Sequence, residues 1–232
     1  MITKDLSSYA KANWTTRYLK PTSELSADAN GVPLVRSDVK MFWFDGIVGD
    51  LFPSNKKNPN STKEKPKSAD ALYLRGGKNK TIYLIEFKRG FGGLLTKESR
   101  TKDERKSADD RLEEMNSSLR MKAIESYVIL ERAFFPFCEN AEGTGTRLFY
   151  WVVIDRGPLG GMENALTFSE SSTLSRSNPP AQIGDALRRL QQCMKVDGIS
   201  KPYIYDCIEV MYADEFEKRL RKVVASRRKI AE

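Results

Sequence analysis

The sequence predicts an α/β protein: a central mixed β-sheet, flanked by helices, in which an antiparallel hairpin carries the candidate site. Two β-rich segments, 68–74 and 81–90, flank a short loop that contains Gly76-Gly77, and this pattern is typical of a hairpin. The continuous apolar run Arg147–Asp155 indicates a central strand that is buried on both faces. Amphipathic segments before and after these strands predict the flanking helices.

The segments before the hairpin predict a helix, a strand region and a loop. Apolar residues at near-helical spacing predict a helix over 5–19, with Pro21 as its stop signal. The segment Val39–Val48 predicts a first strand or a pair of strands. Pro53–Lys67 is rich in Lys, Asn, Pro and Ser, so it is expected to be a solvated loop, with a phosphate-contacting arm as the alternative.

The hairpin brings charged side chains to one place. Side chains alternate between the two faces of a strand, so Glu86 and Lys88 share one face while Phe87 points into the opposite layer. A turn centred on Lys78 would place Asp70 directly opposite Glu86. Two carboxylates and an ammonium are therefore expected to converge at the end of the hairpin.

These residue types suit a divalent metal. Mg²⁺ prefers oxygen ligands and is usually held by one or two carboxylates, with positions left for water and phosphate. The chain contains no histidine, the commonest general base and transition-metal ligand. Carboxylates and lysines must therefore carry any hydrolytic chemistry. Lys88, two residues from Glu86, could hold the attacking water or balance charge on the phosphate.

The spacing of Asp70, Glu86 and Lys88 resembles the PD-(D/E)xK motif of the restriction-endonuclease-like nucleases. The resemblance covers about 36–155, and Ala69 stands where the motif has proline. It implies a restriction-endonuclease-like core: a helix, a three-stranded antiparallel meander, a helix and a further strand. It also implies Mg²⁺ or Mn²⁺ held by Asp70 and Glu86, with the Phe87 carbonyl as a further ligand.

The segment after the hairpin predicts a turn and a long helix. Arg89–Gly93 is expected to be a flexible turn, and a helix is expected over about 104–134. Lys122 falls on the apolar stripe of this helix. A lysine facing the sheet needs a partner, and Asp70 and Glu86, or a substrate phosphate, would serve. The alternative is that Lys122 extends to solvent.

The C-terminal part continues the α/β alternation and is basic at its end. The sequence predicts a Ser/Thr-rich loop over 162–178, a helix over Ala181–Lys195, a strand over Tyr203–Met211 and a helix over Ala213–Lys229. Nucleic-acid contacts are expected from six basic residues: Lys65, Lys67, Arg89, Arg221, Lys222 and Arg228.

Composition agrees with a nucleic-acid partner. The 232 residues suit a single domain, 1–232, with a core over about 36–155, an N-terminal helix and a C-terminal α/β elaboration. The formal net charge of +8 favours a polyanionic partner or an anionic membrane surface, and a soluble basic protein is the alternative. Cys138, Cys193 and Cys207 form no CxxC pattern and suggest buried thiols. The N-terminus lacks an apolar signal core, so a cytoplasmic protein without a membrane segment is expected.

The preferred interpretation is a Mg²⁺- or Mn²⁺-dependent nuclease, a hydrolase of phosphodiester bonds whose expected substrate is DNA ahead of RNA. Asp70 and Glu86 would bind the metal, Lys88 would activate the water and Lys122 would neutralise phosphate. Cleavage of both strands of a duplex would favour a homodimer. The alternatives are a non-catalytic nucleic-acid-binding or assembly module with the same fold, and a basic interaction protein with no nucleic-acid role.

Overall fold

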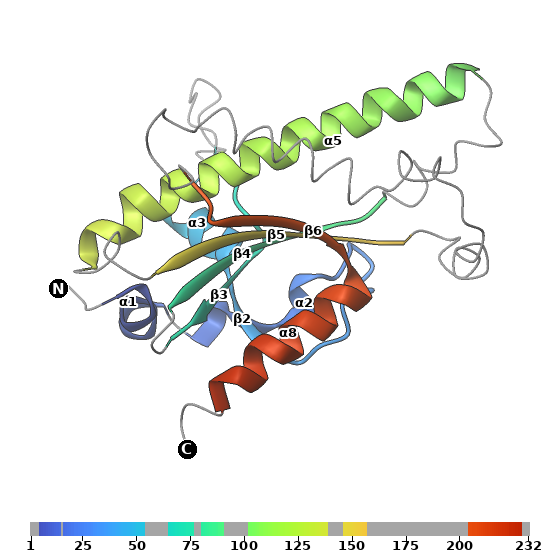
Figure 1. Ribbon diagram of the computed structural model, residues 1–232. Coiled ribbons are helices and arrows are strands. Elements are labelled where there is room, and N and C mark those ends of the chain that lie inside the picture. Colours follow the sequence, from blue (N-terminus) through green and yellow to red (C-terminus); the bar gives the residue numbers. More distant parts are fainter. Residues whose placement is uncertain are drawn as a thin grey trace, which may run out of the picture.

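A six-stranded mixed sheet organises the protein (Figure 1). The computed structural model describes residues 5–14, 16–53, 65–76, 80–90, 102–138, 146–156 and 204–228, with backbone alone at 102–109, 112 and 226–228. The strands lie side by side in chain order: β1 Leu19–Pro21, β2 Lys40–Trp43, β3 Ala71–Arg75, β4 Thr81–Lys88, β5 Arg147–Ile154 and β6 Cys207–Tyr212. Neighbours from β1 to β4 are antiparallel, whereas β4, β5 and β6 run parallel.

Helices cover both faces of this sheet. The longest helix, α5, crosses one face, and α8 lies on the opposite face (Figure 1). The helical elements of the described chain are α1 Leu6–Asn13, η1 Thr16–Tyr18, α2 Thr22–Leu25, α3 Phe44–Leu51, α5 Lys102–Ile129, a π-helical turn η3 Leu130–Phe134, η4 Phe135–Phe137 and α8 Ala213–Arg228. The predicted α/β class with a mixed, helix-flanked sheet is therefore confirmed.

Strand alternation divides the apolar side chains into two cores. On one face, Leu84 of β4 and Tyr150 of β5 pack with Leu119 of α5, and α1 and α3 contribute to the same cluster. On the other face, Ile85 and Phe216 of α8 belong to a second cluster. Because a strand has a side-chain period of two, consecutive residues of β4 enter different cores. β5 is buried on both faces, as its continuous apolar run predicts.

Two N-terminal predictions are corrected. The helix expected over 5–19 ends at Asn13, and Leu19–Pro21 instead forms an edge strand paired with β2. Pairing with a neighbouring strand outweighs local helical spacing here, and proline is tolerated at the edge of a sheet. The strand region expected over Val39–Val48 is strand as far as Trp43 and then becomes α3.

The beginning of α3 depends on a glycine. A Cβ atom on Gly46 would lie 2.3 Å from Cε3 of Trp43, so a larger residue would collide with the Trp43 ring. Three apolar residues of α3, Phe44, Ile47 and Val48, follow the i, i+3, i+4 spacing of a helix and are buried. That spacing was the available signal for a helix, but the aromatic run before it favours a strand.

The remaining predictions are confirmed in part. The helix expected over about 104–134 corresponds to α5 and η3, the strand expected at 203–211 begins at Cys207, and the C-terminal helix ends at Arg228. Outside the described residues lie the turn at Lys78, most of the Pro53–Lys67 loop, the loop at 162–178 and the helix expected over Ala181–Lys195. Among the described helices, none has the length and apolar character needed to cross a membrane.

Candidate active site

The hairpin has the register that the sequence predicts. In the β3–β4 pair, Ala71 lies opposite Ile85 and Arg75 lies opposite Thr81. One further step along both strands places Asp70 opposite Glu86. The backbone N–H of Phe87 donates a hydrogen bond of 2.7 Å to Oδ2 of Asp70. The two strands therefore hold the Asp70 carboxylate beside the start of the Glu86-Phe87-Lys88 segment.

Lys122 joins both carboxylates from α5. Its Nζ atom donates to Oε1 and Oε2 of Glu86 at 2.6 and 2.8 Å, and lies 3.5 Å from Oδ1 of Asp70. The Glu86 side chain is 1% exposed, that of Lys122 is 22% exposed and that of Asp70 is 27% exposed. The prediction that Lys122 faces the two acids is confirmed. The alternative, in which the Lys122 side chain extends away from the acids to solvent, is excluded.

The α5 helix also holds the chain that leads into Asp70. The backbone N–H of Ala69 donates to Oγ of the buried Ser126 at 2.8 Å, and the N–H of Lys67 donates to Oε2 of Glu125. Segment 67–69 precedes β3, and without Ser126 the buried N–H of Ala69 would lose this partner. These two contacts fix the position of Asp70 relative to Lys122.

Sequence analysis missed a third acidic residue, Asp45, in the first turn of α3. Its Oδ1 accepts a hydrogen bond of 2.6 Å from Oγ of Ser68 and pairs with Nζ of Lys65 at 2.7 Å. Its negative charge raises the pKa values of Asp70 and Lys122, although it is a minor cause of each shift. The one signal in the sequence was the place of Asp45 directly before Gly46. That segment belongs to α3, but the sequence predicts a strand there.

The pKa values of the cluster reflect its burial. Burial, and then the charge of Asp70, raises the pKa of Glu86 to about 8, while Lys122 opposes the shift. Burial also raises the pKa of Asp70, against the effects of Lys122 and the Phe87 N–H. Burial lowers the pKa of Lys122, but the charges of Glu86 and Asp70 outweigh it and the net shift is upward. Burial and the neighbouring carboxylate thus favour the protonated form of Glu86, and the Lys122 ammonium opposes this effect.

Lys88 and Phe87 end on opposite faces of β4. The Phe87 ring packs edge-on against Phe216 of α8, with ring centroids 5.8 Å apart. Lys88 is half-buried. Its positive charge opposes part of the upward shift of the Glu86 pKa, as expected for a cation near the site. The role of the Phe87 carbonyl as a metal ligand stays a prediction.

Tyr150 is a buried group near the site that sequence analysis did not single out. Its hydroxyl has no hydrogen-bond partner among the residues that the structure describes. Burial, followed by the charge of Glu86, raises the pKa of this hydroxyl well above its ordinary value. Its neighbour Tyr205 differs, because the Tyr205 hydroxyl donates to the carbonyl of Ala123 at 2.6 Å.

The expected nucleic-acid residues whose side chains the structure describes lie on more than one face of the fold. Lys65 is paired with Asp45, Arg89 contacts Asp28 and the Val32 carbonyl, and Arg221 lies 3.8 Å from Glu217. Three side chains, those of Lys67, Arg221 and Lys222, are exposed. Lys67 adjoins the α5 face, whereas Lys222 belongs to α8 on the opposite face of the sheet. The Arg228 side chain lies outside the described residues.

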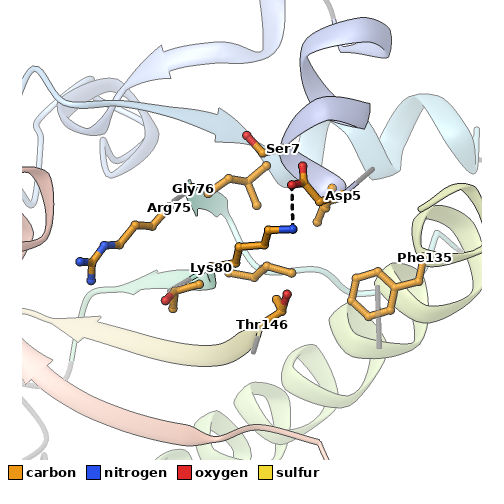
Figure 2. A pocket seen from close by; sticks show the side chains of 11 residues that line it. Asp5, Ser7, Arg75, Gly76, Lys80, Phe135 and Thr146 are labelled. Atoms are coloured by element: carbon orange, nitrogen blue, oxygen red, sulfur yellow. Dashed lines mark ion pairs between the residues drawn. The ribbon is translucent and has the colours of Figure 1, made fainter. Parts of the chain in front are cut away.

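A pocket at the other end of the hairpin is separate from this site (Figure 2). It is lined by residues next to the β3–β4 turn, among them Arg75 and Lys80, and by Asp5 before α1. Figure 2 shows the Asp5 carboxylate turned toward Lys80, with an oxygen–nitrogen distance of 3.1 Å. Arg75 and Asp70 lie at opposite ends of β3, so this pocket does not open onto the acidic cluster.

Comparison of the chain with protein-family models, curated proteins and solved structures found no match.

The oxygen atoms of the acidic cluster are the candidate ligands for a divalent metal. No group of three or more His, Cys, Asp or Glu side chains suited to a metal occurs among the described residues. Asp70 and Glu86 supply two carboxylates that already share one cation, and the Phe87 carbonyl follows in the same strand. This donor set fits Mg²⁺ or Mn²⁺, because Mg²⁺ commonly takes one or two carboxylates and keeps waters or phosphate oxygens as its other ligands.

Proposed function

We propose that the protein is a metal-dependent nuclease that hydrolyses phosphodiester bonds in nucleic acid. The convergence of Asp70 and Glu86 on one cation, with Lys88 on the same strand face, carries this proposal. The chain order of the elements also supports it. The antiparallel strands β2, β3 and β4 are followed by α5 and then by β5 parallel to β4, as expected for a restriction-endonuclease-like core.

Each residue of the cluster has a distinct role in this proposal. Asp70 and Glu86, with the Phe87 carbonyl, would hold Mg²⁺ or Mn²⁺. The bound ion would polarise the phosphoryl group and lower the pKa of water. Lys88 orients the attacking water and offsets the negative charge that develops on the phosphate. As the water oxygen bonds to phosphorus, the bond between phosphorus and the leaving oxygen breaks. Lys122 supplies a second positive charge near the phosphate.

The substrate class follows from charge. The formal net charge of +8 favours a polyanion, and Lys67 is an exposed cation three residues before Asp70. DNA is proposed ahead of RNA, with a cytoplasmic location and a homodimer where both strands of a duplex are cut.

A cleavage assay tests the function directly. The protein is incubated with plasmid, single-stranded DNA and RNA, in Mg²⁺, Mn²⁺ or a chelator. Cleavage that requires the metal and disappears in Glu86→Gln supports the proposal. Glu114→Gln is the matched control, because Glu114 is an exposed acid on α5. Metal-dependent cleavage of equal rate in Glu86→Gln and the parent protein would remove Glu86 from the mechanism.

One observation favours a second candidate, a non-catalytic nucleic-acid-binding module. Lys122 already pairs with the two carboxylates, so part of their negative charge is offset without a metal. Such a module would bind nucleic acid with the same affinity in Mn²⁺ and in chelator and would cut none of the three substrates. The nuclease and this module therefore differ in two measurable properties, the cleavage of nucleic acid and the binding of Mn²⁺ at Asp70 and Glu86.

A further inference from the structure

The ammonium of Lys122 occupies the space between the two acids. It contacts both oxygens of Glu86 at 2.6 and 2.8 Å and lies 3.5 Å from the nearer oxygen of Asp70. A divalent cation bound by the same carboxylates would need those oxygens at about 2.0–2.1 Å. Two cations so close together repel strongly in a buried site. The ammonium and the metal ion therefore exclude one another.

We propose that Lys122 is an internal cation that fills the metal position in the metal-free protein and moves to a nucleic-acid phosphate when a divalent metal binds. This inference rests on the proposed nuclease function and adds a regulatory property to it: metal and nucleic acid bind cooperatively at this site.

Burial explains why the metal-free protein needs this cation. Glu86 is 1% exposed, and a buried carboxylate without a partner is strongly disfavoured. Removal of one member of a buried ion pair destabilises a protein because the other charge remains unpaired. Lys122 thus keeps the acidic cluster folded until a metal replaces it.

The geometry also indicates which partner moves. Asp70 is held by the Phe87 N–H, and Glu86 belongs to β4, where it pairs with Val152 of β5. Lys122 is attached by a flexible four-carbon stem and is 22% exposed, so a route to solvent exists on its side. The carboxylates therefore stay in place while the ammonium leaves.

Cooperativity follows from where the ammonium goes. Metal binding alone moves Lys122 from a carboxylate to water, which weakens metal affinity. When a phosphate is present, the released ammonium gains a new anionic partner, so metal binds more tightly to the nucleic-acid complex. By linkage, the metal raises nucleic-acid affinity by the same factor.

The experiment measures Mn²⁺ binding by titration calorimetry, with and without a non-cleavable phosphorothioate DNA duplex. In Lys122→Met, Mn²⁺ affinity without DNA should rise about 5- to 150-fold, the usual range of coupling between sites, and the DNA-induced increase should disappear. Arg120→Met is the matched control, since it removes a positive charge from α5 two residues away and should behave as the parent protein. Equal Mn²⁺ affinity in Lys122→Met and the parent protein overturns the inference.

A second variant keeps the test decisive if Lys122→Met does not fold without metal. Lys122→Arg retains the charge and binds carboxylates through a planar fork, so its Mn²⁺ affinity without DNA should be lower than that of the parent protein. Unchanged or higher affinity in Lys122→Arg overturns the inference. Metal-dependent cleavage by the parent protein, with no effect of either variant on Mn²⁺ affinity, would leave the nuclease standing and reject the exchange. Absence of both cleavage and Mn²⁺ binding would reject both proposals.

Discussion

Ser126 of α5 accepts a hydrogen bond of 2.8 Å from the backbone N–H of Ala69, the residue directly before Asp70. Both groups are buried, and they connect the long helix to the strand that carries the candidate acid. Lys122 lies one helical turn before Ser126 on the same helix, so a single element positions both the cation and the chain that holds its acidic partner.

Ser126→Ala should destabilise the protein by about 1–3 kcal/mol, because the buried Ala69 N–H would lose its acceptor. Cleavage should also decrease as Asp70 loses its fixed position. Chemical denaturation measures the stability, with Ser117→Ala, an exposed serine of α5, as the control. Equal midpoints for Ser126→Ala and Ser117→Ala would show that this hydrogen bond contributes nothing.

Asp70→Ala and Glu86→Ala should abolish metal-dependent cleavage while nucleic-acid binding is retained or slightly tighter, since each removes negative charge near phosphate. Lys88→Ala should lower turnover more than metal affinity, because Lys88 acts on water and phosphate. Cleavage rates and filter-binding affinities, measured on the same preparations, separate the two effects. A Lys88→Ala protein with normal turnover and weakened Mn²⁺ binding would reverse this assignment.

Tyr150→Phe and Tyr205→Phe should have opposite effects on stability. The Tyr150 hydroxyl is buried and has no hydrogen-bond partner in the described part of the chain, so its removal should leave the free energy of unfolding unchanged or raise it by up to about 1 kcal/mol. The Tyr205 hydroxyl donates to the Ala123 carbonyl, so its removal should cost about 0.5–1.5 kcal/mol or more. A loss of stability in Tyr150→Phe would indicate a partner for that hydroxyl.

The stability of the metal-free protein should decrease as pH rises from about 4.5 to about 8. Burial, and then the Asp70 charge, raises the pKa of Glu86 to about 8 from its ordinary value of 4.5. The folded state therefore holds this proton more tightly than the unfolded chain, and the associated stability is lost when Glu86 ionises. Glu86→Gln should lack this decrease. Asp214→Asn should retain it, because Arg156 lowers the pKa of Asp214 and its titration lies at acidic pH.

Lys67 and Lys222 should differ in their effect on nucleic-acid binding. Lys67 adjoins the acidic site, whereas Lys222 lies on α8 across the sheet. Each lost phosphate contact should reduce the slope of log affinity against log salt by about 0.9 for duplex DNA. Lys67→Ala should show this reduction and Lys222→Ala should not. The reverse result would place the binding surface on α8.

The sequence by itself determined the local geometry of the candidate site. The Gly76-Gly77 loop and the period-two alternation were enough to predict that Asp70 opposes Glu86 and that Phe87 points to the other core. The register of a hairpin follows from the loop that joins its strands, and that information is local in the chain. The stripe on α5 likewise predicted that Lys122 faces the sheet.

The tertiary structure alone decided which distant groups complete the cluster. The packing of separate elements across the sheet decides the contacts of Lys122 with both Glu86 oxygens and the position of Asp45 near Asp70. It also leaves the Tyr150 hydroxyl without a hydrogen-bond partner among the described residues. The same packing turned Leu19–Pro21 into an edge strand. Periodicity identifies the face on which a side chain lies. Only the packing of that face against the rest of the fold determines the atom that the side chain contacts.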